Sequence, residues 1–115
     1  MSQAEQATAY YDRGRIYVAK GDTVSALADL DNAIKLNPQY PDALDTRGNL
    51  YATKGQYDSA IADFSAVVAA DPRNANAHAN LGNAYRAKGQ SDLEQIPVNP
   101  SRSLRERRSW RIRLV

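Results

Sequence analysis

The sequence predicts an all-α protein in which a 34-residue pair of antiparallel helices is repeated about two and a half times. Glycine, tyrosine and a Lys–Gly pair recur at intervals of 34 residues, and apolar residues within each interval keep helical spacing. Aligning residues 7–40 with 41–74 gives eleven identities in 34 positions, whereas about two or three are expected by chance. In such a stack each unit buries its apolar face only against its neighbours.

The first helix of each unit contains a glycine near its middle. Gly14, Gly48 and Gly82 are 34 residues apart. A glycine inside a helix costs about 1 kcal/mol relative to alanine, so we expect a neighbouring helix to come close at these points. Ala26 and Ala60 on the second helices are the expected partners, and the tyrosine three residues after each glycine is expected to fill the space between units.

The ends of the first helices are indicated by proline and glycine. In the second repeat Pro41 suits a first helical turn, because its missing N–H is not needed there. Lys54 and Gly55 predict the end of that helix, with a cation and a C-terminal glycine. The equivalent pair at residues 88–89 predicts the end of the third first-helix, for which Asn74 is the expected N-cap.

The second helix of each unit carries an apolar face and ends before a proline. The second repeat places Ala60, Ile61, Phe64, Val67 and Val68 on one face, and Pro72 follows. The first repeat places Leu27, Leu30, Ala33 and Ile34 in the same way, and Pro38 follows.

The repeat pattern stops after residue 90. Glu94 stands where the small alanine is expected, and Pro97 falls where a helix centre is expected. We therefore expect a repeat array over residues 1–90 and a degenerate cap or basic tail over residues 91–115. The units are repeat one at 7–40, repeat two at 41–74 and a partial repeat three at 75–90.

Three interpretations of this last segment stay open. Residues 1–97 carry nine Lys and Arg against twelve Asp and Glu, a net charge of −3, whereas residues 98–115 carry six Arg and one Glu, a net charge of +5. The segment is either a non-native or truncated end, or a cap over the last helix, or a basic tail that binds nucleic acid or an acidic membrane. An uncapped face around Leu81, Ala84 and Tyr85 would be apolar, and would favour a homo-oligomer through this end.

These repeated residues resemble the tetratricopeptide repeat (TPR) family over about residues 5–90. The family's unit has a large residue, then Leu-Gly, Tyr, Ala, an aromatic or Leu, Ala and Pro at set intervals. The matching residues are Tyr10, Gly14, Tyr17, Ala26, Leu30, Ala33 and Pro38 in repeat one, Leu44, Gly48, Tyr51, Ala60, Phe64, Val67 and Pro72 in repeat two, and His78, Leu81, Gly82 and Tyr85 in repeat three.

The resemblance implies a right-handed superhelix, an α-solenoid, whose first helices line a concave groove that binds a peptide or protein segment. The groove positions are Tyr11, Arg15, Asp42, Asp45, Asn49, Asn76, Asn80, Asn83 and Arg86. One subgroup of the family grips the C-terminal carboxylate of chaperones with lysines, asparagines and an arginine. That clamp is disfavoured here, because Tyr11, Asn76 and Asn80 stand at its basic positions and Asp42 and Asp45 add negative charge.

No constellation of residues predicts catalysis, a metal or a cofactor. The chain has no cysteine, and its single histidine, His78, takes the large-residue position and is expected to pack. Asp29 and Asp63 are expected on solvated faces or in turns. The start has no basic region followed by an apolar run, and the longest apolar run (66–70) is far shorter than a membrane span, so the default expectation is a cytoplasmic, non-enzymatic scaffold. Protein or peptide partners are favoured over nucleic acid or membrane.

Overall fold

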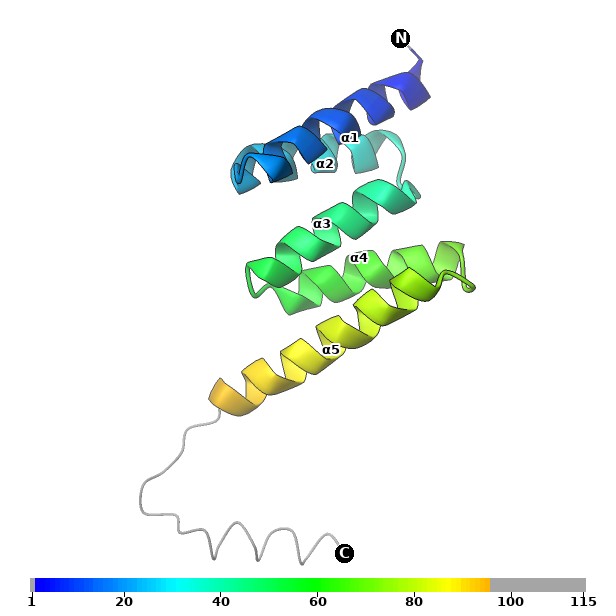
Figure 1. The fold of residues 1–115 in the computed structure, drawn as a ribbon. Helices are drawn as coiled ribbons and strands as arrows, with labels where there is room; N and C mark the ends of the chain where they lie inside the picture. Colours follow the sequence, from blue (N-terminus) through cyan, green and yellow to red (C-terminus); the bar gives the residue numbers. More distant parts are fainter. Residues whose placement is uncertain (1, 96–115) are drawn as a thin grey trace, which may run out of the picture.

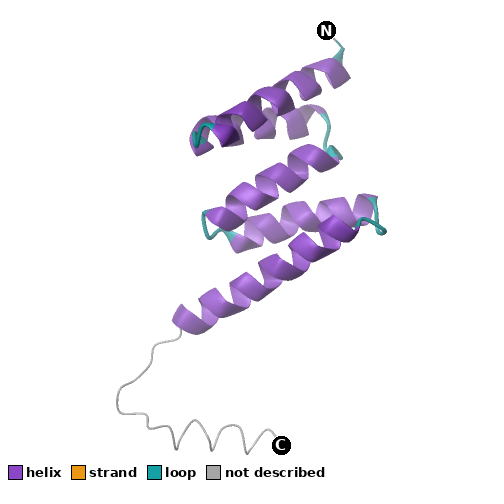
Figure 2. Cartoon of the chain, viewed as in Figure 1, coloured by secondary structure: helices purple, strands orange, loops and turns teal. Residues whose placement is uncertain are grey.

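A computed structural model of the chain describes residues 2–95. This part of the chain folds into five α-helices joined by short turns and contains no β-strand (Figures 1 and 2). The all-α prediction is confirmed. The helices are α1 (Gln3–Ala19), α2 (Thr23–Leu36), α3 (Pro41–Thr53), α4 (Tyr57–Ala70) and α5 (Ala75–Gln95).

The helices pack in sequential antiparallel pairs. α1 packs on α2 and α3 on α4, while α2 contacts α3 and α4 contacts α5 across the repeat boundaries. Figure 1 shows α1, α3 and α5 on the near side of the stack, with α2 and α4 behind them. Because α3 and α5 also contact each other, the first helices of successive repeats form one wall of the stack.

The first two Lys–Gly pairs end their helices as predicted, and the third does not. Gly21 and Gly55 have φ angles of 77° and 78°, in the left-handed region that only glycine adopts at no steric cost. α5 instead runs through Gly89 to Gln95, so the helix end predicted at this glycine is wrong. The boundary expected after residue 90 falls inside α5. A glycine permits the left-handed turn but does not enforce it. The turn also requires a following helix that packs against the first, and the described residues contain none after Gly89.

The predicted signals at Pro41, Asn74 and the two prolines that follow the second helices lie at or next to helix ends, and an unpredicted cap at Asp22 begins α2. The Asp22 carboxylate accepts the backbone N–H of Ser25 at 3.1 Å before α2, and the Asn74 side chain accepts that of Ala77 at 3.0 Å before α5. Pro41 begins α3. Both second helices end two residues before the predicted prolines.

The core is shared between consecutive helices, and no unit has a core of its own. The predicted apolar face of α4 is buried through Ala60, Phe64 and Val67. Because every cluster needs side chains from two or three helices, the units stabilise one another as the repeat predicts. The three clusters are Leu30, Ala33 and Ala43; Leu44, Val67 and Ala77; and Ala60, Phe64 and Ala84.

Two of the mid-helix glycines mark a close approach between helices, as expected. A Cβ atom at Gly48 would lie 2.7 Å from Cε1 of Phe64, and one at Gly14 would lie 3.3 Å from Cγ of Leu30. The partners are thus a large side chain in each unit, and not the alanines four residues earlier. At Gly82 such a Cβ atom would meet no atom within 4 Å beyond the adjacent backbone of α5, because the described chain has no second helix for repeat three.

Asp29 and Asp63 do not lie on solvated faces, and that expectation is wrong. They are only 3% and 5% exposed, and each accepts two hydrogen bonds from an arginine 16 residues earlier. Arg13 donates to Asp29 from Nε and Nη2, both at 2.7 Å, and Arg47 donates to Asp63 from the same atoms at 2.9 and 2.7 Å. These bidentate pairs tie the two helices of a unit together and raise the pKa of both guanidinium groups.

The apolar face expected at the open end is smaller than predicted. Ala84 is buried in the third cluster and Leu81 packs against it, because α5 turns both residues toward α4. Tyr85 is 56% exposed and Leu93 is 68% exposed.

The three interpretations of residues 91–115, as a non-native end, a cap or a basic tail, concern mostly residues 96–115. These residues, including the arginine-rich stretch, lie outside the described part of the chain. Residues 91–95 continue α5.

Candidate functional site

Two rows of polar side chains run along the wall that the first helices form. On α3 the members are three and four residues apart, and on α5 four and three residues apart. These spacings place each row on one face of its helix. The rows are Asp42, Asp45 and Asn49 on α3, and Asn76, Asn80 and Asn83 on α5.

A cavity of about 340 Å³ lies where the two rows meet. Asn49 lines it from α3, and Asn80 and Asn83 line it from α5. Tyr57 and Phe64 of α4 contribute aromatic surface. The structure therefore brings together three of the nine predicted groove residues. The other lining residues are Ala52, Thr53, Ala84 and Ala87.

The asparagines give this cavity both hydrogen-bond donors and acceptors. Each side-chain amide has one acceptor oxygen and two N–H donors. Asn49 and Asn83 are exposed, and their side-chain amides make no hydrogen bond with the described residues. Donors and acceptors also alternate along an extended peptide backbone, so these amides have the chemistry to pair with a main chain.

Asp45 lies on α3 one turn before Asn49, and one of its two carboxylate oxygens has no hydrogen-bond partner among the described residues. This oxygen, Oδ1, is buried. Burial raises the pKa of Asp45, and repulsion from Asp42 one turn earlier raises it further. The side-chain amide of Asn80 on α5 acts in the opposite direction on this pKa. A donor from a ligand would satisfy the buried oxygen.

Tyr11 and Arg15 form a separate cluster on α1 and do not line the cavity. The Tyr11 ring packs against that of Tyr40, with ring centroids 5.1 Å apart. The Arg15 guanidinium lies 5.6 Å from the centroid of the Tyr11 ring, within the range of a cation–π contact.

The remaining predicted groove residues, Asn76 and Arg86, are exposed on α5 and do not line the cavity. Sequence reasoning missed Thr53 and Ala87, which continue the two rows by one helical turn and were detectable from that spacing. Tyr57 was also missed. It lies in the first turn of a second helix, and nothing in the sequence pattern points to it.

Comparison with known proteins decides the family. The family model described as TPR repeat matches residues 14–54 and 48–89, which together span more than half of the chain. The chain belongs to the TPR repeat family. TPR modules generally mediate protein–protein interactions, so protein partners are the general expectation for this TPR chain.

Solved TPR structures support the same assignment. A crystal structure of MamA protein superposes with a TM-score of 0.71 at 30% sequence identity, and covers 80% of this chain and 50% of that one. A second MamA crystal structure gives a TM-score of 0.70 at 31% identity, over 79% of this chain and 53% of that one. The chain thus spans about half the length of these MamA chains. A search of the curated proteins found no significant match.

Within residues 2–95 this TPR chain has no cluster of side chains that could hold a metal ion. His78 does not pack as expected: it is exposed, and its Nε2 lies 2.6 Å from the carbonyl oxygen of Pro72, which makes that nitrogen the donor. Over residues 2–95 no helix is long and apolar enough to span a bilayer. TPR repeats are typically non-catalytic scaffolds.

Proposed function

We propose that this chain is a non-catalytic interaction module that holds an extended peptide segment of a partner protein between α3 and α5. The observation that carries this proposal is the cavity of about 340 Å³ with three asparagine side chains around it. Asn49 faces Asn80 and Asn83 across the cavity from a different helix, so one strand of peptide can contact both walls.

The asparagines are the main-chain contacts in this proposal. The side-chain amides of Asn49 and Asn83 have no partner among the described residues, so a ligand does not have to displace an internal hydrogen bond. Each amide–peptide hydrogen bond contributes about 1 kcal/mol net. Tyr57 and Phe64 add apolar surface against which one ligand side chain packs.

Charge near the cavity sets a preference among peptides. Asp42 and Asp45 lie one turn apart on α3, and the buried Oδ1 of Asp45 has no partner among the described residues. A ligand with a lysine, an arginine or a free N–H at this point would pair with it. A peptide that ends in a carboxylate there would be repelled, in agreement with the argument against a chaperone-type clamp.

The test is selection from a random peptide library displayed on phage, followed by affinity measurements on the chain with the recovered peptides. We expect a double Asn49→Ala and Asn83→Ala variant to bind these peptides about tenfold or more weakly, because two main-chain hydrogen bonds are lost. Asn32 is exposed on α2, away from the cavity, so Asn32→Ala is the matched control and should bind as the unaltered chain does. Equal affinity of all three chains would refute the groove as the binding site.

A further inference from the structure

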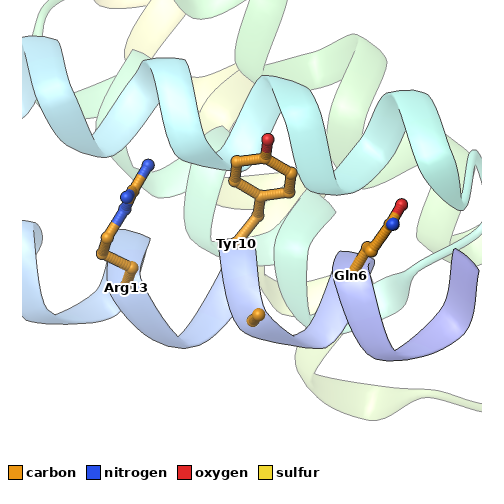
Figure 3. A pocket seen from close by; sticks show the side chains of 4 residues that line it. Gln6, Tyr10 and Arg13 are labelled. Atoms are coloured by element: carbon orange, nitrogen blue, oxygen red, sulfur yellow. The ribbon is translucent and has the colours of Figure 1, made fainter. Parts of the chain in front are cut away.

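Four residues of α1 line a cavity of about 460 Å³ at the start of the stack. Figure 3 shows three of them, Gln6, Tyr10 and Arg13, projecting side by side from α1 toward α2. Ala9 completes the set. Each of the four residues has a counterpart 34 positions later in the sequence. These counterparts lie on the face of α3 that packs against the first repeat. They are Tyr40, Ala43, Leu44 and Arg47.

On α3 these counterparts are docked onto α2. Ala43 is fully buried in a cluster with Leu30 and Ala33. Leu44 is 4% exposed and has Ile34 packed beside it.

A hydrogen bond completes this docked interface. Arg47 uses Nε and Nη2 to bind Asp63 in its own repeat, and its third nitrogen, Nη1, donates to Asp31 of α2 at 2.9 Å. The docked arrangement therefore combines small-residue packing, an aliphatic contact and a charged hydrogen bond.

On α1 the same set meets α2 of its own repeat, where Tyr10 packs beside Leu30 and Ala33, but no helix of a preceding repeat lies against it in the described part of the chain. Ala9 is exposed where its counterpart is fully buried. The Arg13 side chain is 59% exposed, against 20% for that of Arg47. Arg13 binds Asp29 through Nε and Nη2, and its Nη1 binds none of the described residues. Ile16, also on α1, is 54% exposed.

We propose that this face of α1, defined by Gln6, Ala9, Tyr10 and Arg13, binds a helix of a partner protein in the way that α3 binds α2. The helix that fits has the same residue pattern as α2. An aliphatic residue is followed directly by a carboxylate; a small residue and a second aliphatic residue stand three and four positions after the first aliphatic residue. Leu30, Asp31, Ala33 and Ile34 are the example within this chain. The carboxylate binds Nη1 of Arg13, and the small residue packs on Ala9.

A second copy of the chain is a poor occupant of this face. The described helices of the required type are α2 and α4, and they are covered by α3 and α5. In addition, α4 has Ser65 at the position of Asp31 and so lacks the carboxylate. The surface is distinct from the proposed peptide groove, because it lies on α1 and shares no residue with that cavity.

The probe for this proposal is a synthetic peptide of residues 22–37, which covers α2 with its caps. Positions 28 and 32 are exposed in α2, and a hydrocarbon staple between them keeps the peptide helical without touching the docking residues. Binding to the full chain is measured by fluorescence anisotropy. Circular dichroism confirms that the peptide is helical and that each chain variant is folded.

We expect the stapled peptide to bind the full chain, and Asp31→Asn in the peptide to weaken binding about tenfold, since a hydrogen bond between charged groups is lost. Ala9→Glu in the chain should remove binding by placing a charge on the docking surface. Ala62→Glu is the matched control, because Ala62 is exposed on α4, and it should leave binding unchanged.

Three results would overturn the proposal. One is no binding by a peptide that is demonstrably helical. Another is binding that survives Ala9→Glu, which would mean that the peptide displaces α2 or enters the groove. The third is a concentration-dependent dimer of the chain alone, seen by sedimentation and abolished by Ala9→Glu, which would make the occupant a second copy.

Discussion

Arg47 on α3 and Asp31 on α2 are joined by a hydrogen bond of 2.9 Å across the boundary between the first and second repeats. The same guanidinium binds Asp63 within the second repeat, so one side chain connects three successive helices. Arg13 makes only the intra-repeat pair among the described residues. The two arginines are therefore equivalent in sequence and unequal in structure.

Replacing Arg47 should destabilise the fold more than replacing Arg13. Arg47→Ala leaves Asp63 buried without a partner, and we expect a loss of about 3 kcal/mol in the free energy of unfolding. Arg13→Ala should cost less, because its side chain is more exposed and it binds one carboxylate instead of two. Urea denaturation followed by circular dichroism measures both. Equal losses would mean that the inter-repeat hydrogen bond contributes nothing.

Alanine should have opposite effects at two equivalent glycines. Gly48→Ala places a Cβ atom 2.7 Å from the Phe64 ring and should lower the free energy of unfolding by about 2 kcal/mol. Gly82→Ala meets no atom within 4 Å beyond the adjacent backbone of α5 and should raise it by up to about 1 kcal/mol through higher helix propensity. Thermal unfolding of the two variants checks the signs. A destabilised Gly82→Ala would show that a further element packs on α5 there.

At neutral pH the ionised Asp45 should lower the free energy of unfolding, compared with a variant that has an uncharged side chain at this position. The folded-state pKa of Asp45 is raised, so the protonated form is favoured by folding and the ionised form opposes it. Asp45→Asn should therefore raise the free energy of unfolding slightly at neutral pH, by less than about 1 kcal/mol, because solvent screens this partly exposed group. As pH falls through the raised pKa, the unaltered carboxyl protonates and the difference between the two proteins should shrink. Unfolding curves at several pH values test this. A difference that does not change with pH would contradict it.

Gly21 and Gly89 hold the same repeat position and should respond differently to alanine. Gly21→Ala forces a side chain into a left-handed turn with a φ of 77° and should cost about 1 kcal/mol. Gly89 lies inside α5, so Gly89→Ala should raise the helix content and the stability. Circular dichroism decides between a continuous α5 and a chain that turns at Gly89, because a turn there would make the alanine destabilising.

Much of the fold was predictable, because it depends on residues that the repeat itself identifies. The 34-residue period located the helix pairs, Pro41 and Asn74 marked helix starts, and Gly48 marked a close helix contact. The partner of Gly48 was mistaken because sequence spacing gives the helix face but not which side chain on that face reaches across. The continuation through Gly89 was missed because the turn depends on packing by a following helix, which no local pattern specifies.

The candidate site was predictable only in part. The family resemblance put Asn49, Asn80 and Asn83 in one groove, and all three line one cavity, while their role as peptide contacts stays a prediction. Tyr11 and Arg15 were assigned to the groove by repeat position; the Tyr11 ring packs on that of Tyr40 and the Arg15 guanidinium lies over the Tyr11 ring, which the repeat pattern did not indicate. The buried Arg–Asp pairs were missed although their 16-residue spacing recurs in both units, since single charged residues are usually exposed.

The extension of α5 beyond Gly89 also determines where local unfolding begins. A salt bridge joins Lys88 of α5 to Asp58 at the start of α4. The α5 residues after Lys88 are mostly exposed, and Leu93 is 68% exposed. Local opening requires little free energy where few side chains are buried. Amide hydrogens over residues 89–93 should therefore exchange with solvent long before those beside Phe64, so that this helix unravels from its far end while the stack behind it stays closed.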